Sequence, residues 1–468
     1  MNKTITILHI NDLHGTYDGW LKQAAFLKQR KRELEAQGTP YLLLDAGDHL
    51  DMSINECLAT RGHLHLDMLA ALGVHAMTVG NNEVLRSSVE LVRELSAASP
   101  VPWLLANLRE ADGSPIGGMR DSLLLDLGDG IKAGLVGVTD QFEDLYERKH
   151  GFRNLDTLTV LREAIADLRG QGANLIVFLS HVGYEADVEI AKELSSEIDV
   201  IVGGHSHTVL EAPVIESGVV IVQAGSHARY VGELELTIDV EQGRIVAQEG
   251  RLHEVRPDWP EDERQAELLA RGRREMDAFF AEELTELDKP LRHEELVQVM
   301  AESLRDFWQA DIGVLFGAAA TDGLSAGTVT KGDVFSVCRS MLTATKLSYQ
   351  GKHLLGMIRE TFNPEITEKR MWGNGIRPGG LPVGRLQFAG LTYELQEDGD
   401  VVDVRVNGEP IEEERWYTAG SIGHLGEPDF CYYPAVAGTK TLDIDKFTMT
   451  KDVLVAYLRD LGKVTAGN

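Results

Sequence analysis

The sequence is poor in cysteine and in positive charge, and it lacks long apolar runs. Its three cysteines, Cys57, Cys338 and Cys431, form neither a CxxC motif nor a disulfide framework. No segment approaches the roughly 18 apolar residues of a membrane-spanning helix. Lysine and arginine total 45 against 74 aspartates and glutamates, which gives a formal net charge of −29. Because so acidic a surface repels polyanions, we expect neither nucleic-acid polymers nor membranes as partners.

The remaining composition is typical of a folded protein with more than one domain. Hydrophobic residues make up 43% and charged residues 25% of the 468 residues, and this length allows two or three separate cores. The first ten residues contain no apolar segment of the kind that export signals carry. We therefore expect a cytoplasmic protein, whose oligomeric state does not follow from the sequence.

Apolar runs with strand character alternate with helical patterns over roughly the first 255 residues. The runs are Thr4–His9, Tyr41–Leu44, His75–Val79, Trp103–Ala106, Lys132–Val138, Leu175–Leu179, Asp199–Val202 and Val219–Gln223. This alternation predicts βαβ units of the α/β class, in which helices pack in layers against sheets.

The second half of the chain has a different pattern. A charged helical segment begins near Pro260, a residue suited to the first position of a helix. Beyond it we expect a helix at Glu294–Trp308, a hairpin that turns at Asn407-Gly408 and a closing helix at Lys451–Leu461. We predict three parts: an α/β domain at 1–256, a linker helix at 257–285 and a smaller α+β domain at 286–468.

Several of the predicted strands end in side chains that bind metals. Asp48 follows Tyr41–Leu44, and Gly47 lets the backbone turn so that the carboxylate projects from the carboxyl end of the strand. The other side chains of this kind are Asp12, His14, Asn81, His181, His205 and His207. Asp12 and His14 are two positions apart, as are His205 and His207. The two members of such a pair share one side of an extended chain and can chelate one ion.

Four histidines, two aspartates and one asparagine suit two divalent ions that share a carboxylate, about 3.5–4 Å apart. Mixed imidazole and carboxylate ligation favours Mn, Zn, Fe or Co over Mg. Each residue alone has an ordinary alternative, such as a helix cap or a surface imidazole. Their common position at strand ends predicts a metal site.

These motifs resemble the calcineurin-like metallophosphoesterases, specifically the 5′-nucleotidase family. The matching segments are Ile5–Gly15, Gly47-Asp48, Gly80-Asn81, Ser180-His181 and Gly204–His207, followed by Gly390–Glu394, Val406–Gly408 and Tyr417–Phe430. The resemblance implies a four-layer α/β/β/α domain that a helix joins to an α+β substrate domain. It also implies hydrolysis of phosphoester or phosphoanhydride bonds in a small, nucleotide-like phosphorylated substrate.

The same resemblance divides the ligands between two ions. The first ion would take Asp12, His14, Asp48 and His207, and the second would take Asp48, Asn81, His181 and His205. A bridging water or hydroxide would be the nucleophile.

The chain departs from the family at the catalytic dyad. In the family, Gly-Asn is followed by histidine and, three residues later, by aspartate, which together stabilise the transition state and protonate the leaving group. This chain has Asn82 and Leu85 there, and neither side chain can act as an acid. His49, Glu83 and Arg86 lie nearby and are candidates to compensate. A signal-less bacterial branch shares the Asn-Asn-Glu variant, so we expect Asn82, with Asp48, to occupy the catalytic position.

The substrate motifs also depart from the family pattern. Phe316–Thr321 stands where the family has an Asn-Gly-Gly-Gly-Ile-Arg anchor. Arg385 and Phe430 align with the two positions that stack on a base, and a guanidinium plane can stack in this way. Arg377 is a candidate for bidentate contact with phosphate or carboxylate. For both arginines the alternative is a surface ion pair.

Two functions therefore compete. The intact ligand set predicts a metal-dependent phosphoric ester hydrolase. The missing dyad and altered anchor favour a nucleotide-binding or sensing protein whose turnover is attenuated or lost. We expect the hydrolase, because seven ligand positions are present.

Overall fold

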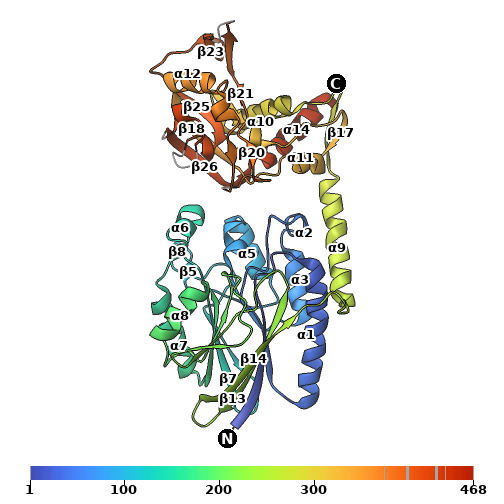
Figure 1. Cartoon of the computed structure of the whole chain (residues 1–468), viewed down its shortest axis with the longest axis vertical. Coiled ribbons are helices and arrows are strands. Elements are labelled where there is room, and N and C mark those ends of the chain that lie inside the picture. Colours follow the sequence, from blue (N-terminus) through green and yellow to red (C-terminus); the bar gives the residue numbers. More distant parts are fainter. Residues whose placement is uncertain (1, 374, 397–399, 427–430, 438, 467–468) are drawn as a thin grey trace. The chain divides into compact units, whose positions relative to one another are not determined.

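The structure is a computed structural model that describes the whole chain except residues 1, 374, 397–399, 427–430, 438 and 467–468 (Figure 1). The chain divides into two compact units, Met1–Met276 and Asp277–Asn468. Their boundary falls within helix α9 (Glu263–Phe280), which corresponds to the charged helix expected from the sequence.

The first unit contains two six-stranded sheets, with strand orders β14-β13-β1-β2-β3-β4 and β11-β12-β10-β9-β7-β6. The strands of the first sheet are β1 (Asn2–Ile10), β2 (Tyr41–Asp45), β3 (Ala76–Thr78), β4 (Trp103–Leu104), β13 (Tyr230–Asp239) and β14 (Arg244–Glu254). Those of the second are β6 (Ser122–Asp126), β7 (Lys132–Thr139), β9 (Leu175–His181), β10 (Val200–Gly203), β11 (Val214–Glu216) and β12 (Val219–Val222). A short pair, β5 (Leu108–Arg109) and β8 (Arg153–Asn154), lies outside both sheets.

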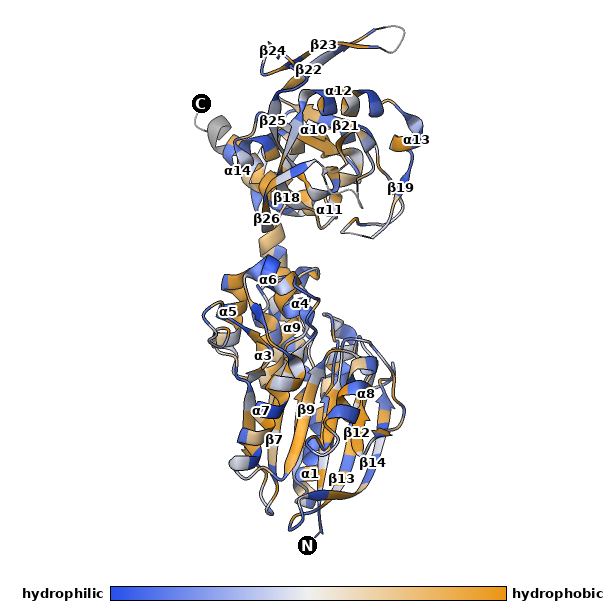
Figure 2. Cartoon of the chain, turned by 90° about the vertical axis from the view of Figure 1, so that its left-hand side faces the viewer, coloured by the Kyte–Doolittle hydropathy of each residue, from blue (hydrophilic) through white to orange (hydrophobic). Residues whose placement is uncertain are grey.

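The two sheets pack face to face between layers of helices, which confirms the four-layer α/β/β/α prediction. On β1, Ile5 and Ile7 point into the core between the sheets, while Leu8 points into the core under the helices. This alternation is the two-residue period of a strand buried on both faces. Figure 2 shows the resulting apolar character of β7 and β9 in orange.

Helices cover the outer face of each sheet. α1 (Tyr17–Gln37), α3 (His63–Leu72) and α5 (Val89–Ala98) contribute to the core of the first sheet, and α7 (Thr157–Gly170) and α8 (Tyr184–Glu193) to that of the second. The shorter helices are α2 (Asn55–Ala59), α4 (Asn81–Leu85) and α6 (Leu145–His150). Ser88 and Asp156 cap α5 and α7 by accepting backbone hydrogen bonds, which fixes where these helices begin.

The hairpin of β13 and β14 does not appear among the predicted runs. β13 pairs antiparallel with β1 and extends the sheet beyond its parallel strands. Most of β14 is exposed to solvent, so its sequence lacks the alternation of apolar and polar residues that marks a half-buried strand.

The second unit contains a five-stranded sheet of order β21-β16-β25-β18-β26. Its strands are β16 (Ile312–Phe316), β18 (Thr343–Gln350), β21 (Leu386–Ala389), β25 (Trp416–Ile422) and β26 (Lys440–Met449). Its helices are α10 (His293–Trp308), α11 (Lys331–Val337), α12 (Gly351–Glu360), α13 (Pro364–Thr367) and α14 (Thr450–Ala466). Small sheets form from β15 (Glu283–Leu287) with β17 (Gly327–Thr330), β19 (Arg370–Met371) with β20 (Leu381–Pro382), and β22 (Leu391–Leu395) with β23 (Val401–Val406) and β24 (Glu409–Pro410). The hairpin predicted at Asn407-Gly408 joins β23 to β24.

Within the part of the chain that the structure describes, no helix has the length and apolar character needed to span a bilayer.

Glu233 on β13 is a buried carboxylate that ties the hairpin to α1. It accepts hydrogen bonds from Arg30 Nε and Nη2 at 3.1 and 2.9 Å, from Arg251 Nη2 at 3.0 Å and from His253 Nε2 at 2.7 Å. Burial alone would raise the pKa of Glu233, but His253 and Arg30 outweigh it and lower the pKa to about 2. The carboxylate is therefore charged in the folded protein at any ordinary pH.

We predict that Glu233→Gln lowers the free energy of unfolding at pH 7 by about 2 kcal/mol, because charge-assisted hydrogen bonds are lost. Because the pKa of Glu233 is lower in the folded than in the unfolded chain, the carboxylate stabilises the fold fully at pH values above about 4.5, the pKa in the unfolded chain. This stabilisation is lost as the pH falls toward 2. The variant and wild type should therefore converge in urea unfolding at acid pH. Glu235→Gln, at an exposed position of the same strand, is the control and should match wild type. A constant difference between pH 7 and pH 3 would contradict this prediction.

Candidate metal centre

The seven predicted metal ligands meet at the carboxyl ends of strands from both sheets of the first unit. β1, β2 and β3 are adjacent and parallel in one sheet, as are β9 and β10 in the other. The residues at or just beyond the ends of these strands are Asp12, His14, Asp48, Asn81, His181, His205 and His207. Because parallel strands present their carboxyl ends at one edge, residues far apart in the sequence become neighbours there.

Five of these seven residues have a left-handed backbone. The φ angles are 51° at Asp12, 48° at His14, 54° at Asp48, 71° at His205 and 56° at His207. This conformation costs a non-glycine residue roughly 1–2 kcal/mol. Such strain concentrates at functional sites, where the surrounding structure holds side chains in place against it.

Two glycines beside Asp48 allow its close packing. Gly47 has a φ of 90°, and a Cβ there would lie 2.8 Å from Gly80 N and from His181 Nδ1. A Cβ on Gly80 would lie 2.1 Å from Asp48 Oδ1. The Gly-Asp and Gly-Asn pairs in the sequence therefore reflect the contact between two loops, where only glycine fits.

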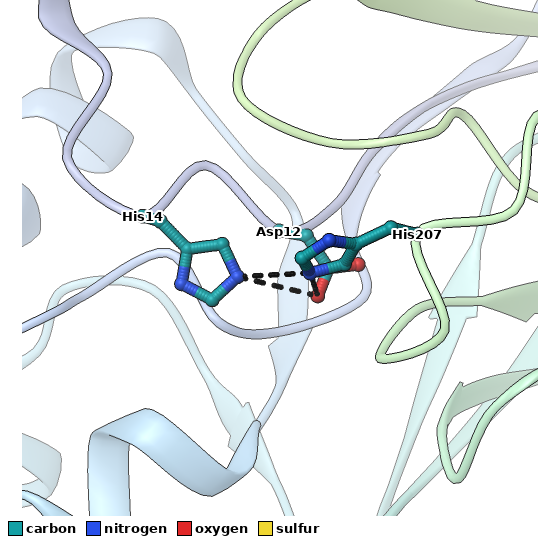
Figure 3. A group of neighbouring side chains, drawn as sticks. All are labelled: Asp12, His14 and His207. Atoms are coloured by element: carbon teal, nitrogen blue, oxygen red, sulfur yellow. Dashed lines mark hydrogen bonds and ion pairs between the residues drawn. The ribbon is translucent and has the colours of Figure 1, made fainter. Parts of the chain in front are cut away.

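Asp12, His14 and His207 form the first group of ligand atoms (Figure 3). His14 Nε2 and His207 Nε2 face each other at 3.1 Å. Asp12 Oδ1 lies 3.3 Å from His207 Nε2 and 3.8 Å from His14 Nε2. Two imidazole nitrogens and a carboxylate oxygen that converge in this way are a donor set suited to a transition-metal ion.

Asp48 and His181 form a second group with Asp12. His181 Nδ1 donates to the carbonyl of Ala46 at 2.7 Å, which directs Nε2 toward Asp48 Oδ2 at 3.4 Å. His181 Nε2 is buried and has no hydrogen-bond partner among the described residues. Asp48 Oδ2 also lies 3.7 Å from His14 Nε2. Asp12 therefore belongs to both groups, Asp48 of the second group lies near His14 of the first, and the orphaned nitrogen fits a metal ligand.

Carboxylates outside the ligand set orient two of the histidines. Asp51 Oδ2 lies 3.7 Å from His14 Nδ1, on the side of the ring away from Asp12. His205 Nε2 donates to Asp140 Oδ2 at 3.1 Å, while its Nδ1 lies 2.9 Å from Asn81 Oδ1. Partners of this kind fix the orientation of a metal-binding imidazole and raise its basicity. Asp51 and Asp140 were not predicted, although Asp140 directly follows β7 and carries the same strand-end signal as the ligands.

The ligand atoms lie among several carboxylates. Burial alone would raise the pKa of Asp48, but His181 and a hydrogen bond from Asn82 hold it well below its usual range. Burial alone would lower the pKa of His181, yet the carboxylates of Asp48 and Asp12 raise it to about 10. Carboxylates that draw a proton onto a buried histidine attract a divalent cation more strongly, because it carries more charge.

Asn82 is turned toward Asp48. Its backbone N–H donates to Asp48 Oδ1 at 2.8 Å and its Nδ2 donates to Asp48 Oδ2 at 2.6 Å. The side chain is buried, so it holds the carboxylate and does not face solvent. Leu85 ends the short helix α4, and it has no acid group to offer.

The three candidates to replace the dyad have other partners. His49 is buried, with Nδ1 2.9 Å from Asp45 Oδ2. Glu83 is buried and accepts hydrogen bonds from three backbone N–H groups. Arg86 is exposed, with Nη1 3.4 Å from Asp51 Oδ1. His49 and Glu83 therefore support the loops, while Arg86 holds the carboxylate that orients His14.

The predicted substrate residues lie in the second unit. The Arg385 guanidinium lies 5.6 Å from the centre of the Phe362 ring, and Arg377 Nη1 donates to the preceding carbonyl at 2.8 Å. Both side chains are exposed, and neither makes an ion pair with the described residues. Phe430 lies outside the described residues. Phe316, which stands at the family's anchor position, is buried in the core.

The comparisons with known families identify both units. Residues 5–209 match the calcineurin-like phosphoesterases, and residues 276–426 match the 5′-nucleotidase C-terminal domain. The chain is a calcineurin-like phosphoesterase with a 5′-nucleotidase C-terminal domain. This confirms the resemblance of its motifs, and it makes the protein a phosphoric ester hydrolase of a family that binds divalent metals.

Three relatives show how far the similarity extends. The chain is 28% identical to an uncharacterized metallophosphoesterase, YunD, of Bacillus subtilis, over 89% of this chain and 91% of that protein. It is 27% identical to an apyrase of Aedes albopictus, over 75% and 71%. A structure of a 5′-nucleotidase precursor from Thermus thermophilus aligns with a TM-score of 0.56 at 22% identity, over 98% and 97%, which shows a common fold.

We predict that Asp48→Asn loses all bound metal, because a neutral amide bridges cations far less well than a carboxylate. Elemental analysis after dialysis against Mn²⁺ should give two ions per chain in wild type. The control Asp18→Asn, at an exposed position of α1, should retain them. Two ions per chain in Asp48→Asn would show that this carboxylate is no shared ligand.

Asp140→Asn should weaken metal binding about 10–100-fold, since His205 loses its anionic partner while the ligand itself remains. Competition with a chelator measures this affinity. Asp144→Asn is the matched control in the same segment, because Asp144 pairs with the exposed Arg148. Equal affinities in the two variants would mean that Asp140 has no influence on the ligand.

Proposed function

We propose that the chain hydrolyses phosphoester or phosphoanhydride bonds in small, nucleotide-like substrates with the help of two divalent ions. Asp12, His14, Asp48 and His207 would hold one ion, and Asp48, Asn81, His181 and His205 the other. The observation that carries this proposal is the closeness of the two groups of ligand atoms: they share Asp12, and Asp48 of the second group lies 3.7 Å from His14 of the first.

The donor set favours Mn, Zn, Fe or Co over Mg, because imidazole nitrogen suits transition metals better than the hard Mg ion. When bound, two such metal ions would neutralise the charge on the phosphoryl oxygens and would provide a hydroxide nucleophile at neutral pH. The curated relatives named as apyrases and 5′-nucleotidases support a nucleotide as substrate.

The chain's own residues would position these ions and the substrate. Asn82 holds both oxygens of Asp48 through two donors, so we assign it a positioning role. Ala46 and Asp140 fix the rings of His181 and His205. Arg377, Arg385 and Phe430 remain candidate contacts with the substrate.

A nucleotide-binding or sensing protein whose turnover is attenuated or lost is the less favoured alternative. The missing dyad supports it, but the curated relatives include named enzymes. A screen of phosphate release from nucleotides, dinucleotides and aryl phosphates, each with Mn²⁺, Zn²⁺, Co²⁺ or Mg²⁺, separates the two. Metal-loaded protein that binds nucleotides and releases no phosphate from any substrate would establish the sensor.

We predict a preference for substrates with good leaving groups. A positioned general acid typically contributes about 10²–10⁴ in rate, and Asn82 and Leu85 supply none. Alkyl esters such as AMP should therefore be slow, while p-nitrophenyl phosphate and phosphoanhydrides should be fast, because their leaving groups depart as anions. Measurement of kcat across leaving groups of graded pKa should give a steep dependence. If AMP reacted as fast as p-nitrophenyl phosphate with chemistry rate-limiting, another group would have to donate the proton.

A further inference from the structure

The loop between β12 and β13 holds a histidine against the metal centre. The backbone N–H of His227 donates to the carbonyl of Asp12 at 2.8 Å, so the loop is tied to a ligand residue. The His227 ring centre lies 5.2 Å from that of His14 and 5.6 Å from that of His207. His227 is exposed, whereas Asp12 and His14 are not. Its imidazole therefore borders the first ligand group on a side open to solvent.

The backbone of this loop is strained. His227 and Ala228 have φ angles of 57° and 52°, so two successive non-glycine residues are left-handed. Histidine is enriched in this conformation and would by itself be unremarkable in a turn. Alanine is not enriched in this conformation. Ala228 is buried and packs closely against Gly19, where an added Cβ would lie 2.9 Å from the Cβ of Ala228. Strain of this kind indicates that the position of the His227 ring matters.

The His227 ring stands beside the ligand group without belonging to it. Asp12, His14 and His207 offer donor atoms within 4.8 Å of one another, and His227 is not part of that group. Its Nδ1 lies 2.8 Å from Ser226 Oγ. With the serine hydroxyl as donor to Nδ1, the proton of a neutral imidazole is on Nε2, which is then a hydrogen-bond donor.

We propose that His227 is a substrate-binding residue that donates a hydrogen bond from Nε2 to a phosphoryl oxygen at the metal centre. This rests on the proposed function, because it requires a phosphoryl group beside the first ion. The role needs no proton transfer. His227 would supply a hydrogen-bond donor next to the anionic phosphoryl group. Such a donor is needed because the protein carries a net charge of −29 and the side-chain N–H of Asn82 already donates to Asp48.

The test compares His227→Phe, which keeps a ring without a donor, with His227→Gln, which keeps an amide donor. Calorimetric titration of inorganic phosphate into the Mn²⁺-loaded full chain measures binding without turnover. We expect His227→Phe to bind phosphate about tenfold or more weakly, as for one lost charge-assisted hydrogen bond, and His227→Gln to stay within about threefold. His63→Phe, at a partly exposed histidine paired with Glu94, should match wild type. Metal content should be the same in all four proteins.

Unchanged phosphate affinity in His227→Phe would overturn the proposal, as would failure of the metal-loaded wild type to bind phosphate. Loss of metal from His227→Phe would overturn it too, because His227 would then be a ligand of the ion. A wild type that binds phosphate but hydrolyses nothing refutes the proposed function alone, and the comparison of the variants still decides the role of His227.

Discussion

The Asp48 carboxylate is the interaction on which the rest of this site depends. It is buried, yet it stays charged because Asn82 donates two hydrogen bonds and His181 lies 3.4 Å away. A buried charge is stable only when neighbouring donors and cations compensate for lost hydration. β2, which delivers Asp48, lies between β1 and β3, so the groups around the carboxylate come from neighbouring strands and from the second sheet.

The two-sheet fold creates a dense cluster of polar groups that would be unfavourable without an ion. His181 Nε2 is buried without a hydrogen-bond partner among the described residues, and the carboxylates of Asp12 and Asp48 lie close together beside it. Left-handed backbone at five ligand positions adds a local cost. The extensive cores on both faces of the sheets offset these costs and keep the cluster in place.

The strands could be predicted, and so could the position of the candidate ligands at one edge of the sheets, because each leaves a local signal, an apolar run followed by a side chain of a metal-binding type. The partners of those ligands could not, because Asp51 reaches His14 and Asp140 reaches His205 only through tertiary contacts. The same holds for His227, which a loop far along the chain brings to Asp12. The direction of Asn82 toward Asp48 also depends on contact between loops and not on the sequence around it.

The central claim is that two ions share Asp48, and electron paramagnetic resonance of the Mn²⁺-loaded protein tests it most directly. Ions about 3.5–4 Å apart with a common carboxylate are magnetically coupled. At two equivalents of Mn²⁺ the account predicts the spectrum of an exchange-coupled pair, with closely spaced hyperfine lines. A spectrum of isolated, six-line Mn²⁺ at full occupancy would contradict it.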